Sequence, residues 1–179
     1  MGAGLGGGSS DAAFFIKLLN EKFALHIPVT EQINFAKQLG SDCAFFIDNK
    51  PVYAIEKGDI FSELKIDLSK YCIVVVYPAV HSDTALAYKG IVPKKPQKNI
   101  QAILADDIST WTNNLVNDFE KNLFAQFPEL KNIKEIFYKH GALYAAMSGS
   151  GSAMFGVFKA DIDVKEFAFP DNYIIRANL

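Results

Sequence analysis

Two glycine- and serine-rich segments carry the residue types in this chain that are best suited to binding a phosphate group. The first spans residues 2–10, Gly-Ala-Gly-Leu-Gly-Gly-Gly-Ser-Ser, and runs directly into an apolar pattern with helical spacing. Glycine has no Cβ, so several backbone N–H groups in such a segment can approach one anion. The first turn of the following helix adds unpaired N–H groups and the positive end of the helix dipole. We therefore predict a phosphate site and a nucleotide-dependent enzyme.

The second segment is Ser-Gly-Ser-Gly-Ser at residues 148–152, between two apolar runs typical of strands. It could close against the same phosphates, or it could be a simple hairpin turn, since glycine-rich hairpins are common. The first segment also has an alternative, because a glycine-rich stretch behind Met1 resembles an engineered flexible linker. The unbroken run into residues 9–11, which are good helix-capping types, favours the phosphate interpretation.

Composition excludes several classes of protein. Half of the 179 residues are apolar, so the chain is not expected to be disordered. Its net charge of −2 argues against binding to nucleic acid or to an anionic membrane. Cys43 and Cys72 form no CxxC pair, and the three histidines are scattered, which argues against disulfide frameworks and structural zinc. No signal peptide is recognised, and the apolar run at 71–77 is too short to span a bilayer. We expect a soluble cytoplasmic protein with a small-molecule substrate.

The positioning elements follow from hydrophobic spacing and turn residues. Helices are predicted over 9–25, 30–39, 82–89, 99–106, 111–127 and 128–140, short helical turns at 43–47 and 163–167, and strands over 52–55, 60–68, 71–77, 142–147, 153–158 and 173–177. Thr30 is the expected N-cap of the second helix, and Gly141 the expected stop after 128–140. From residue 71 onward, the order of elements favours an α+β fold with helices over a small antiparallel sheet.

Four stretches, in order, resemble the GHMP kinases, the superfamily of galactokinase, homoserine kinase and mevalonate kinase. They are residues 2–13, 39–46, 117–120 and 141–155. The triple glycine ahead of Ser9 is closest to members that phosphorylate the 2-hydroxyl of a cytidine-diphosphate-linked methylerythritol, in the non-mevalonate route to isoprenoid precursors. The resemblance implies a GHMP kinase-like two-domain fold. Residues 1–68 would be a remnant of the N-terminal ATP-binding domain, and 69–179 the C-terminal domain with its small antiparallel sheet.

The resemblance also implies ATP and Mg²⁺ as cofactors and assigns residues to them. The expected nucleotide contacts are Gly2, Ala3, Gly4, Leu5, Gly6, Gly7, Gly8, Ser9 and Ser10 in the first segment, with Gly149, Ser150 and Gly151 in the second. Ser10 can also reach a Mg²⁺ ion. For Ser9 and Ser10 the alternative is pure helix capping, which uses the same geometry.

Asp42 is the expected catalytic residue, orienting or deprotonating the acceptor hydroxyl and so also touching substrate. Its alternative role is an N-cap for the turn at 43–47. The family usually has proline where this chain has Ala44, a change that could loosen the turn without removing the carboxylate. Thr84 matches a substrate-contacting threonine of the family, or is simply an early helix residue. Asn117 and Glu120 fit a family motif between the domains and are interpreted as structural.

Family members carry, upstream of their phosphate motif, a lysine that polarises the reacting groups and much of the adenine and cytidine pockets. Met1 coincides with a position inside that motif, so we expect the isolated chain to be inactive or nearly so and to self-associate through exposed apolar surface. Another GHMP kinase of the homoserine or mevalonate type, and a non-catalytic folded fragment, are the rival interpretations. A dinucleotide-binding protein is disfavoured, because no second strand precedes Glu21.

Overall fold

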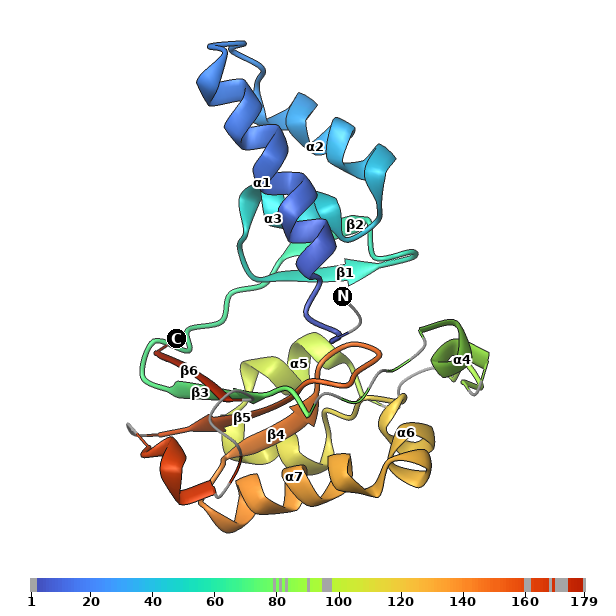
Figure 1. The fold of residues 1–179 in the computed structure, drawn as a ribbon, viewed down its shortest axis with the longest axis vertical. Helices are drawn as coiled ribbons and strands as arrows, with labels where there is room; N and C mark the ends of the chain where they lie inside the picture. The colour runs from blue at the N-terminus through green and yellow to red at the C-terminus, as the bar shows by residue number, and fades with distance from the viewer. Residues whose placement is uncertain are drawn as a thin grey trace. The chain divides into compact units, whose positions relative to one another are not determined.

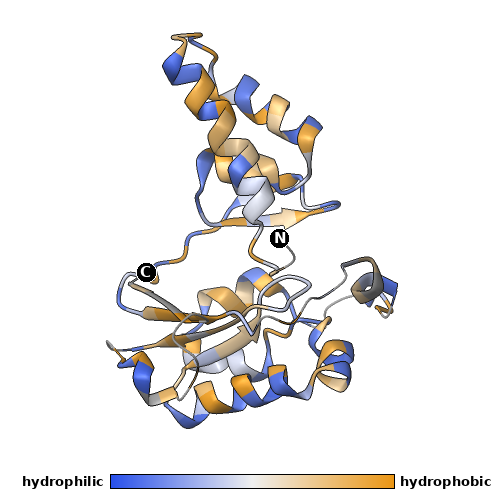
Figure 2. Cartoon of the chain, viewed as in Figure 1, coloured by the Kyte–Doolittle hydropathy of each residue, from blue (hydrophilic) through white to orange (hydrophobic). Residues whose placement is uncertain are grey.

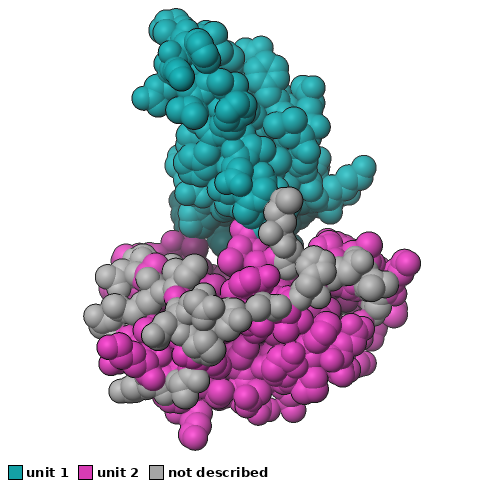
Figure 3. All heavy atoms as spheres, viewed as in Figure 1, with its two compact units in different colours: residues 1, 6–65 teal, residues 2–5, 66–179 magenta. Residues whose placement is uncertain are grey.

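The computed structural model describes residues 3–78, 80, 82, 84–89, 91–94, 98–159, 162–167, 169 and 174–178. They form two compact units (Figure 3). Unit 1 consists of the described residues of 6–65, and unit 2 of those of 2–5 and 66–179. Described residues 3–5 therefore belong to unit 2, the chain then forms unit 1, and it returns to unit 2 at Ile66.

Unit 1 contains three helices and a hairpin among its described residues (Figure 1). The helices are α1 (Gly7–Lys22), α2 (Val29–Leu39) and α3 (Cys43–Asp48), and the antiparallel strands are β1 (Val52–Ile55) and β2 (Ile60–Glu63). The expected strand over 60–68 therefore ends five residues early, at Glu63.

Small side chains form the core of unit 1. The buried cluster consists of Ala13 from α1, Ala36 from α2, and Cys43, Ala44 and Ile47 from α3. Because alanine and cysteine are short, the three helices can approach one another closely. The Lys17 ammonium donates a hydrogen bond to the Ile47 carbonyl oxygen at 3.2 Å, which ties the last turn of α3 to α1.

The connection between α1 and α2 corrects two expectations. The first helix ends at Lys22 and not at residue 25, and Ala24 and His26 both have positive φ. The Asn20 side chain then satisfies both backbone polar groups of Ile27, which lies in the connection. Its Oδ1 accepts from the Ile27 N–H at 2.9 Å, and its Nδ2 donates to the Ile27 oxygen at 3.1 Å. The expectation that Thr30 caps α2 is wrong, because the helix already begins at Val29, behind Pro28.

Unit 2 is built on an antiparallel sheet. Its described strands are β3 (Cys72–Val76), β4 (Tyr144–Met147), β5 (Met154–Phe158) and β6 (Ile174–Asn178), in the order β4-β5-β3-β6. Val74 lies opposite Gly156 on one side and Arg176 on the other, so β3 is a central strand. The predicted α+β class with a small antiparallel sheet is confirmed.

Helices pack on both faces of this sheet. They are α4 (Thr84–Lys89), α5 (Ile100–Ala105), the 3₁₀ helix η1 (Ile108–Asn113), α6 (Glu120–Gln126), α7 (Pro128–Lys139) and the 3₁₀ helix η2 (Val164–Phe167). Alternate residues of β4 enter different cores, as the two-residue period of a strand requires. Ala145 and Met147 join a cluster with α6 and α7, whereas Tyr144 and Ala146 join a cluster with α5 and η1.

The single helix predicted over 111–127 is wrong. The structure has η1 and α6 instead, separated at residues 114–119. Asn117 provides the reason, because its side chain competes with helical hydrogen bonding. Its Oδ1 accepts from the Phe119 N–H at 3.0 Å, while its Nδ2 donates to the Met147 oxygen at 2.9 Å.

The boundaries of α7 follow the predicted signals. Pro128 occupies its first turn, where a missing N–H costs nothing, and Gly141 follows its end with φ +86°. Within the described parts of the chain, no helix has the length and apolar character needed to cross a membrane.

Phe137 is predicted to be the most sensitive core position of unit 2. It is fully buried, and its ring makes edge contacts with Phe158, Phe167 and Phe169. Replacing it with alanine should lower the free energy of unfolding by about 3–5 kcal/mol, measured by urea denaturation. The matched change of exposed Val116 to alanine should alter it by less than about 0.5 kcal/mol. Equal effects would contradict the assigned core.

Candidate active site

In unit 2, Ala3 and Gly4 of the first glycine-rich segment lie beside the second segment. The Ala153 N–H donates to the Ala3 carbonyl oxygen at 2.9 Å, and the Ser148 hydroxyl donates to the Gly4 carbonyl oxygen at 2.8 Å. Residues 144 and 150 positions apart in the chain thus share direct hydrogen bonds. Of the first segment, Gly2 lies outside the described residues.

Gly4 is in the closest contact of this arrangement. Its φ is +74°, and a Cβ placed on it would stand 2.1 Å from the Ser148 carbonyl oxygen and 3.0 Å from the Gly151 nitrogen. No side chain fits in that space, and an L-residue rarely adopts that φ. Glycine is therefore required at this position if the two segments are to touch.

The second segment is the turn of the β4–β5 hairpin. The Ser148 N–H donates to the Ala153 oxygen at 2.8 Å, and the Gly151 N–H donates to the Ser148 oxygen at 2.9 Å. The loop is thus a hairpin connection, one of the two interpretations of its sequence. It additionally packs against the first segment, which an isolated hairpin does not require.

Asn117 and Glu120 form hydrogen bonds to this hairpin, which is consistent with the structural role expected for them. The Asn117 amide donates to both the Met147 and the Gly149 oxygens, at 2.9 and 2.8 Å. Glu120, buried at 6% exposure, accepts from the Met147 N–H at 2.8 Å and pairs with Lys134 at 2.6 Å. A buried charge that is both paired and hydrogen-bonded can hold a strand end in place.

Tyr144 adds to the rigidity of the strand below the loop. Burial, with a smaller contribution from the Glu120 charge, raises the pKa of its hydroxyl, which donates to the Leu115 oxygen at 3.0 Å. The group therefore stays protonated and serves as a structural donor.

The N-terminus of α1 has the features of an anion site. Gly6 precedes the helix with φ +65°, no side chain caps it, and the first turn contains no acidic residue. Gly7 and Gly8 are exposed, while Ser9 and Ser10 are half-buried. The expectation that residues 9–11 supply the cap is wrong, because the helix begins two residues before Ser9 and uses Gly6 as its N-cap. The serine hydroxyls lie in the first turn of α1.

Asp42 immediately precedes α3 in unit 1. Although it occupies the N-cap position, its side chain makes no capping hydrogen bond, and the residue is exposed. Phe46 follows it by one helical turn, and its ring lies 2.9 Å from the point where Gly6 would carry a Cβ. Because residues four apart share a helix face, Asp42 lies on the side of α3 that contacts the start of α1.

Thr84 and Ser150 meet in unit 2, with their hydroxyl oxygens 3.2 Å apart. The structure thus places the expected substrate contact next to one expected nucleotide contact. It also shows hydrogen bonds of two serines that were not singled out as site residues: Ser82, and Ser152 within the second segment. Ser82 donates to the Ser150 oxygen at 2.7 Å, and Ser152 donates to the Val80 oxygen. Both are buried, and only their hydroxyl type hinted at such bonds.

No group of three His, Cys, Asp or Glu side chains gathers to hold a metal in the part of the chain that the structure describes. Mg²⁺ in phosphoryl-transfer enzymes is commonly bound by one or two protein oxygens together with substrate phosphates. The hydroxyl of Ser10, in the uncapped first turn of α1, fits a magnesium site of that kind.

Comparison with protein-family models gives two matches. Residues 1–50 match the GHMP kinases N terminal domain, and residues 99–174 match the model described as GHMP kinases C terminal. Together they cover more than half of the sequence. The chain belongs to the GHMP kinase family.

Two similar curated relatives are named 4-diphosphocytidyl-2-C-methyl-D-erythritol kinase. The protein from Cytophaga hutchinsonii is 52% identical over 159 residues, which are 88% of this chain and 59% of the relative. The one from Bacteroides fragilis is 45% identical over 178 residues, 99% of this chain and 65% of the relative. The chain thus spans about three fifths of the length of these relatives.

Two solved structures agree with the family assignment. A crystal structure of 4-(cytidine 5'-diphospho)-2C-methyl-D-erythritol kinase superposes with a TM-score of 0.73 at 32% identity, over 87% of this chain and 57% of that one. Homoserine kinase from Cytophaga hutchinsonii has a TM-score of 0.66 at 18% identity, covering 89% of this chain and 57% of that one. The second likeness concerns the fold alone.

We predict that alanine at Gly4 separates the two glycine segments. The left-handed conformation costs alanine about 1–2 kcal/mol, and the added Cβ would overlap the Ser148 oxygen. The Ala153 N–H should then lose its bond to Ala3 and exchange with deuterium at least about tenfold faster.

Gly7 provides the matched control for this change. It is helical, and a Cβ added there meets nothing within 4 Å. The Gly7→Ala variant should leave exchange at Ala153 unchanged. Unchanged exchange in Gly4→Ala as well would show that the Gly4 contact is not needed.

Proposed function

We propose that this protein is an ATP-dependent kinase that phosphorylates the 2-hydroxyl of 4-diphosphocytidyl-2-C-methyl-D-erythritol. The reaction serves the non-mevalonate route to isoprenoid precursors. Family membership and the names of the relatives support the assignment. The observation that carries it is the close packing of Ala3 and Gly4 against residues 148–153, which brings two glycine-rich segments to one place.

The proposed nucleotide contacts are the backbone and hydroxyl groups of residues 2–10 and of residues 149–151. In unit 1, the unpaired N–H groups of the first turn of α1 are proposed to bind phosphate. Mg²⁺, with Ser10 as a proposed ligand, would neutralise charge on those phosphates.

Phosphoryl transfer needs positioning and charge stabilisation more than covalent chemistry. Glycine backbone N–H groups hold the phosphates without adding positive side chains, and aligning donor with acceptor could contribute roughly 7–11 kcal/mol. The Asp42 carboxylate is proposed to accept a hydrogen bond from the acceptor hydroxyl and to orient or deprotonate it. The lack of a capping bond leaves its oxygens available for this role.

Thr84 is proposed to contact the acceptor substrate. It is exposed at the first position of α4, and its hydroxyl lies 3.2 Å from that of Ser150. An acceptor held by Thr84 would therefore lie next to the hairpin proposed to bind the nucleotide.

We keep the domain assignment as a proposal as well: residues 1–68 belong to the ATP-binding domain and 69–179 to the C-terminal domain. The two family-model matches, at 1–50 and 99–174, support it. A cytoplasmic location also stays a proposal. A homoserine- or mevalonate-type kinase and a non-catalytic fragment are the alternatives, and the titration below separates them.

Calorimetric titration tests the proposed function. The chain should bind Mg·ATP, and 4-diphosphocytidyl-2-C-methyl-D-erythritol should bind where homoserine and mevalonate do not. Binding of homoserine or mevalonate instead would favour another member of the family. Absence of binding by any nucleotide or acceptor would support the non-catalytic alternative.

Replacing Asp42 with asparagine is predicted to slow phosphoryl transfer without weakening Mg·ATP binding. General-base catalysis typically contributes at least about 10²-fold, so a loss of that size is expected. Single-turnover assays with protein in excess over labelled ATP would measure it, even where steady-state turnover is low. Asp48→Asn, at the other end of α3, is the control and should retain the wild-type rate.

A wild-type rate in Asp42→Asn would exclude the carboxylate from the reaction. The same assay decides whether the 179-residue chain is inactive by itself, which stays a prediction. Ready turnover by the wild-type chain would overturn that expectation.

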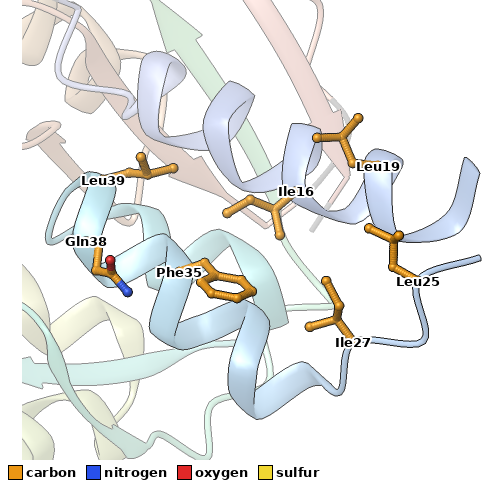
Figure 4. Close-up of a pocket in the computed structure, with 7 residues that line it drawn as sticks. All are labelled: Ile16, Leu19, Leu25, Ile27, Phe35, Gln38 and Leu39. Atoms are coloured by element: carbon orange, nitrogen blue, oxygen red, sulfur yellow. The ribbon is translucent and has the colours of Figure 1, made fainter. Parts of the chain in front are cut away.

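Self-association is proposed from the apolar surface of unit 1. Much of the ribbon of α1 and α2 has hydrophobic colouring (Figure 2). The exposed apolar side chains of these helices include Phe14, Phe15, Leu18 and Leu39. Between these helices lies an apolar hollow, lined by Ile16, Leu19, Leu25, Ile27, Phe35, Gln38 and Leu39 (Figure 4). Contiguous exposed apolar surface of this kind tends to be covered by association.

Light scattering should therefore report a dimer or larger species. Leu18→Glu, which places a charge on this surface, should shift the protein toward monomer. Val116→Glu, at a similarly exposed apolar residue of unit 2, should not. A stable monomer of the wild-type protein would contradict self-association.

A further inference from the structure

A row of hydroxyl groups connects the segment before α4 to the hairpin at residues 148–152. Ser82 Oγ donates to the Ser150 carbonyl oxygen at 2.7 Å, and Ser152 Oγ donates to the Val80 carbonyl oxygen. Thr84 Oγ1 lies 3.2 Å from Ser150 Oγ. Two short segments that are separated by more than 60 positions are thus joined at three places.

Burial makes two of these bonds difficult to replace with water. Ser82 is 4% exposed and Ser152 is fully buried. Removing the hydroxyl at either site, as serine-to-alanine does, leaves a carbonyl oxygen without its partner in a poorly solvated place. The hydroxyl row therefore favours one relative position of the two segments.

The segments it joins have different proposed ligands. Thr84, at the start of α4, is a proposed acceptor contact, whereas Ser150 is a proposed nucleotide contact. At the other end of α4, the Tyr88 ring makes an edge contact with the Phe119 ring, with 5.0 Å between the ring centroids. Moving the hairpin would therefore disturb the acceptor segment, and moving that segment would disturb the hairpin.

We infer that Ser82 and Ser152 are positioning residues that couple acceptor binding to nucleotide binding. The inference rests on the proposed function. A cytidine-diphosphate-linked alcohol that binds the Thr84 hydroxyl lies one hydrogen bond from Ser150, and Ser82 bonds the same residue. A nucleoside triphosphate that binds Ser150 therefore meets a hairpin whose hydroxyl contacts the acceptor already influences. By thermodynamic linkage, each ligand raises the affinity for the other by the same factor.

The coupling factor is the quantity to measure. The Kd of a non-hydrolysable Mg·ATP analogue would be determined by calorimetry with and without 4-diphosphocytidyl-2-C-methyl-D-erythritol. In the wild-type chain the acceptor should tighten nucleotide binding by about tenfold, within the range usual for coupled sites. In Ser82→Ala the factor should fall below about twofold, while both ligands still bind. A merely structural loss would weaken each affinity without removing the coupling.

Three further variants sharpen the test. Ser82→Thr keeps the hydroxyl and should restore coupling, and Ser152→Ala should lose it as Ser82→Ala does. Ser109→Ala removes an exposed hydroxyl whose hydrogen bond to Asp107 is local and involves neither segment. Its coupling factor should equal that of the wild-type protein. Melting temperatures establish that each variant is folded.

Deuterium exchange gives a readout that needs no ligand. In free Ser82→Ala, amides of residues 148–153 should exchange several-fold faster than in wild type, and those of α7 should not. Wild-type protein that binds both ligands without coupling, or Ser82→Ala that keeps full coupling, would overturn this inference alone. Wild-type protein that binds neither ligand would overturn the proposed function, and the coupling with it.

Discussion

The close contact between the Gly4 backbone and the β4–β5 hairpin is the constraint on which the site depends. It leaves no room for a side chain, as the 2.1 Å separation from a hypothetical Cβ shows. Everything around it stabilises this contact. Asn117 and Glu120 bond to Gly149 and Met147 of the hairpin. The hydroxyls of Ser82 and Ser152 join the hairpin to the segment before α4. The strands themselves provide a rigid platform, since helices cover both faces of the sheet.

Much of this arrangement could be predicted from residue types. The two glycine segments were expected to converge because both have the composition of phosphate loops. The apolar run at 71–77 and the Pro128 and Gly141 signals around α7 located β3 and α7 correctly. These features depend on local backbone preferences, which the sequence expresses directly.

Other features depended on partners far along the chain and could not be predicted. The break between η1 and α6 arises because Asn117 bonds to Met147 and Gly149, whose proximity only the folded sheet establishes. Ser9 and Ser10 are good capping residues, yet the helix starts earlier, where Gly6 adopts a left-handed conformation. Asp42 occupies a cap position without capping, so local propensity alone would have misassigned its side chain.

The pairing of Ala3 with Ala153 has a consequence for how the protein is made. These partners lie 150 positions apart, and the whole of unit 1 is synthesised between them. Loop closure over such a distance carries a large entropic cost that must be met before the contact can form. On the ribosome, Ala3 and Gly4 must therefore wait, without their partners, until residues 148–153 have emerged. The contact between the two glycine-rich segments should accordingly form late in folding.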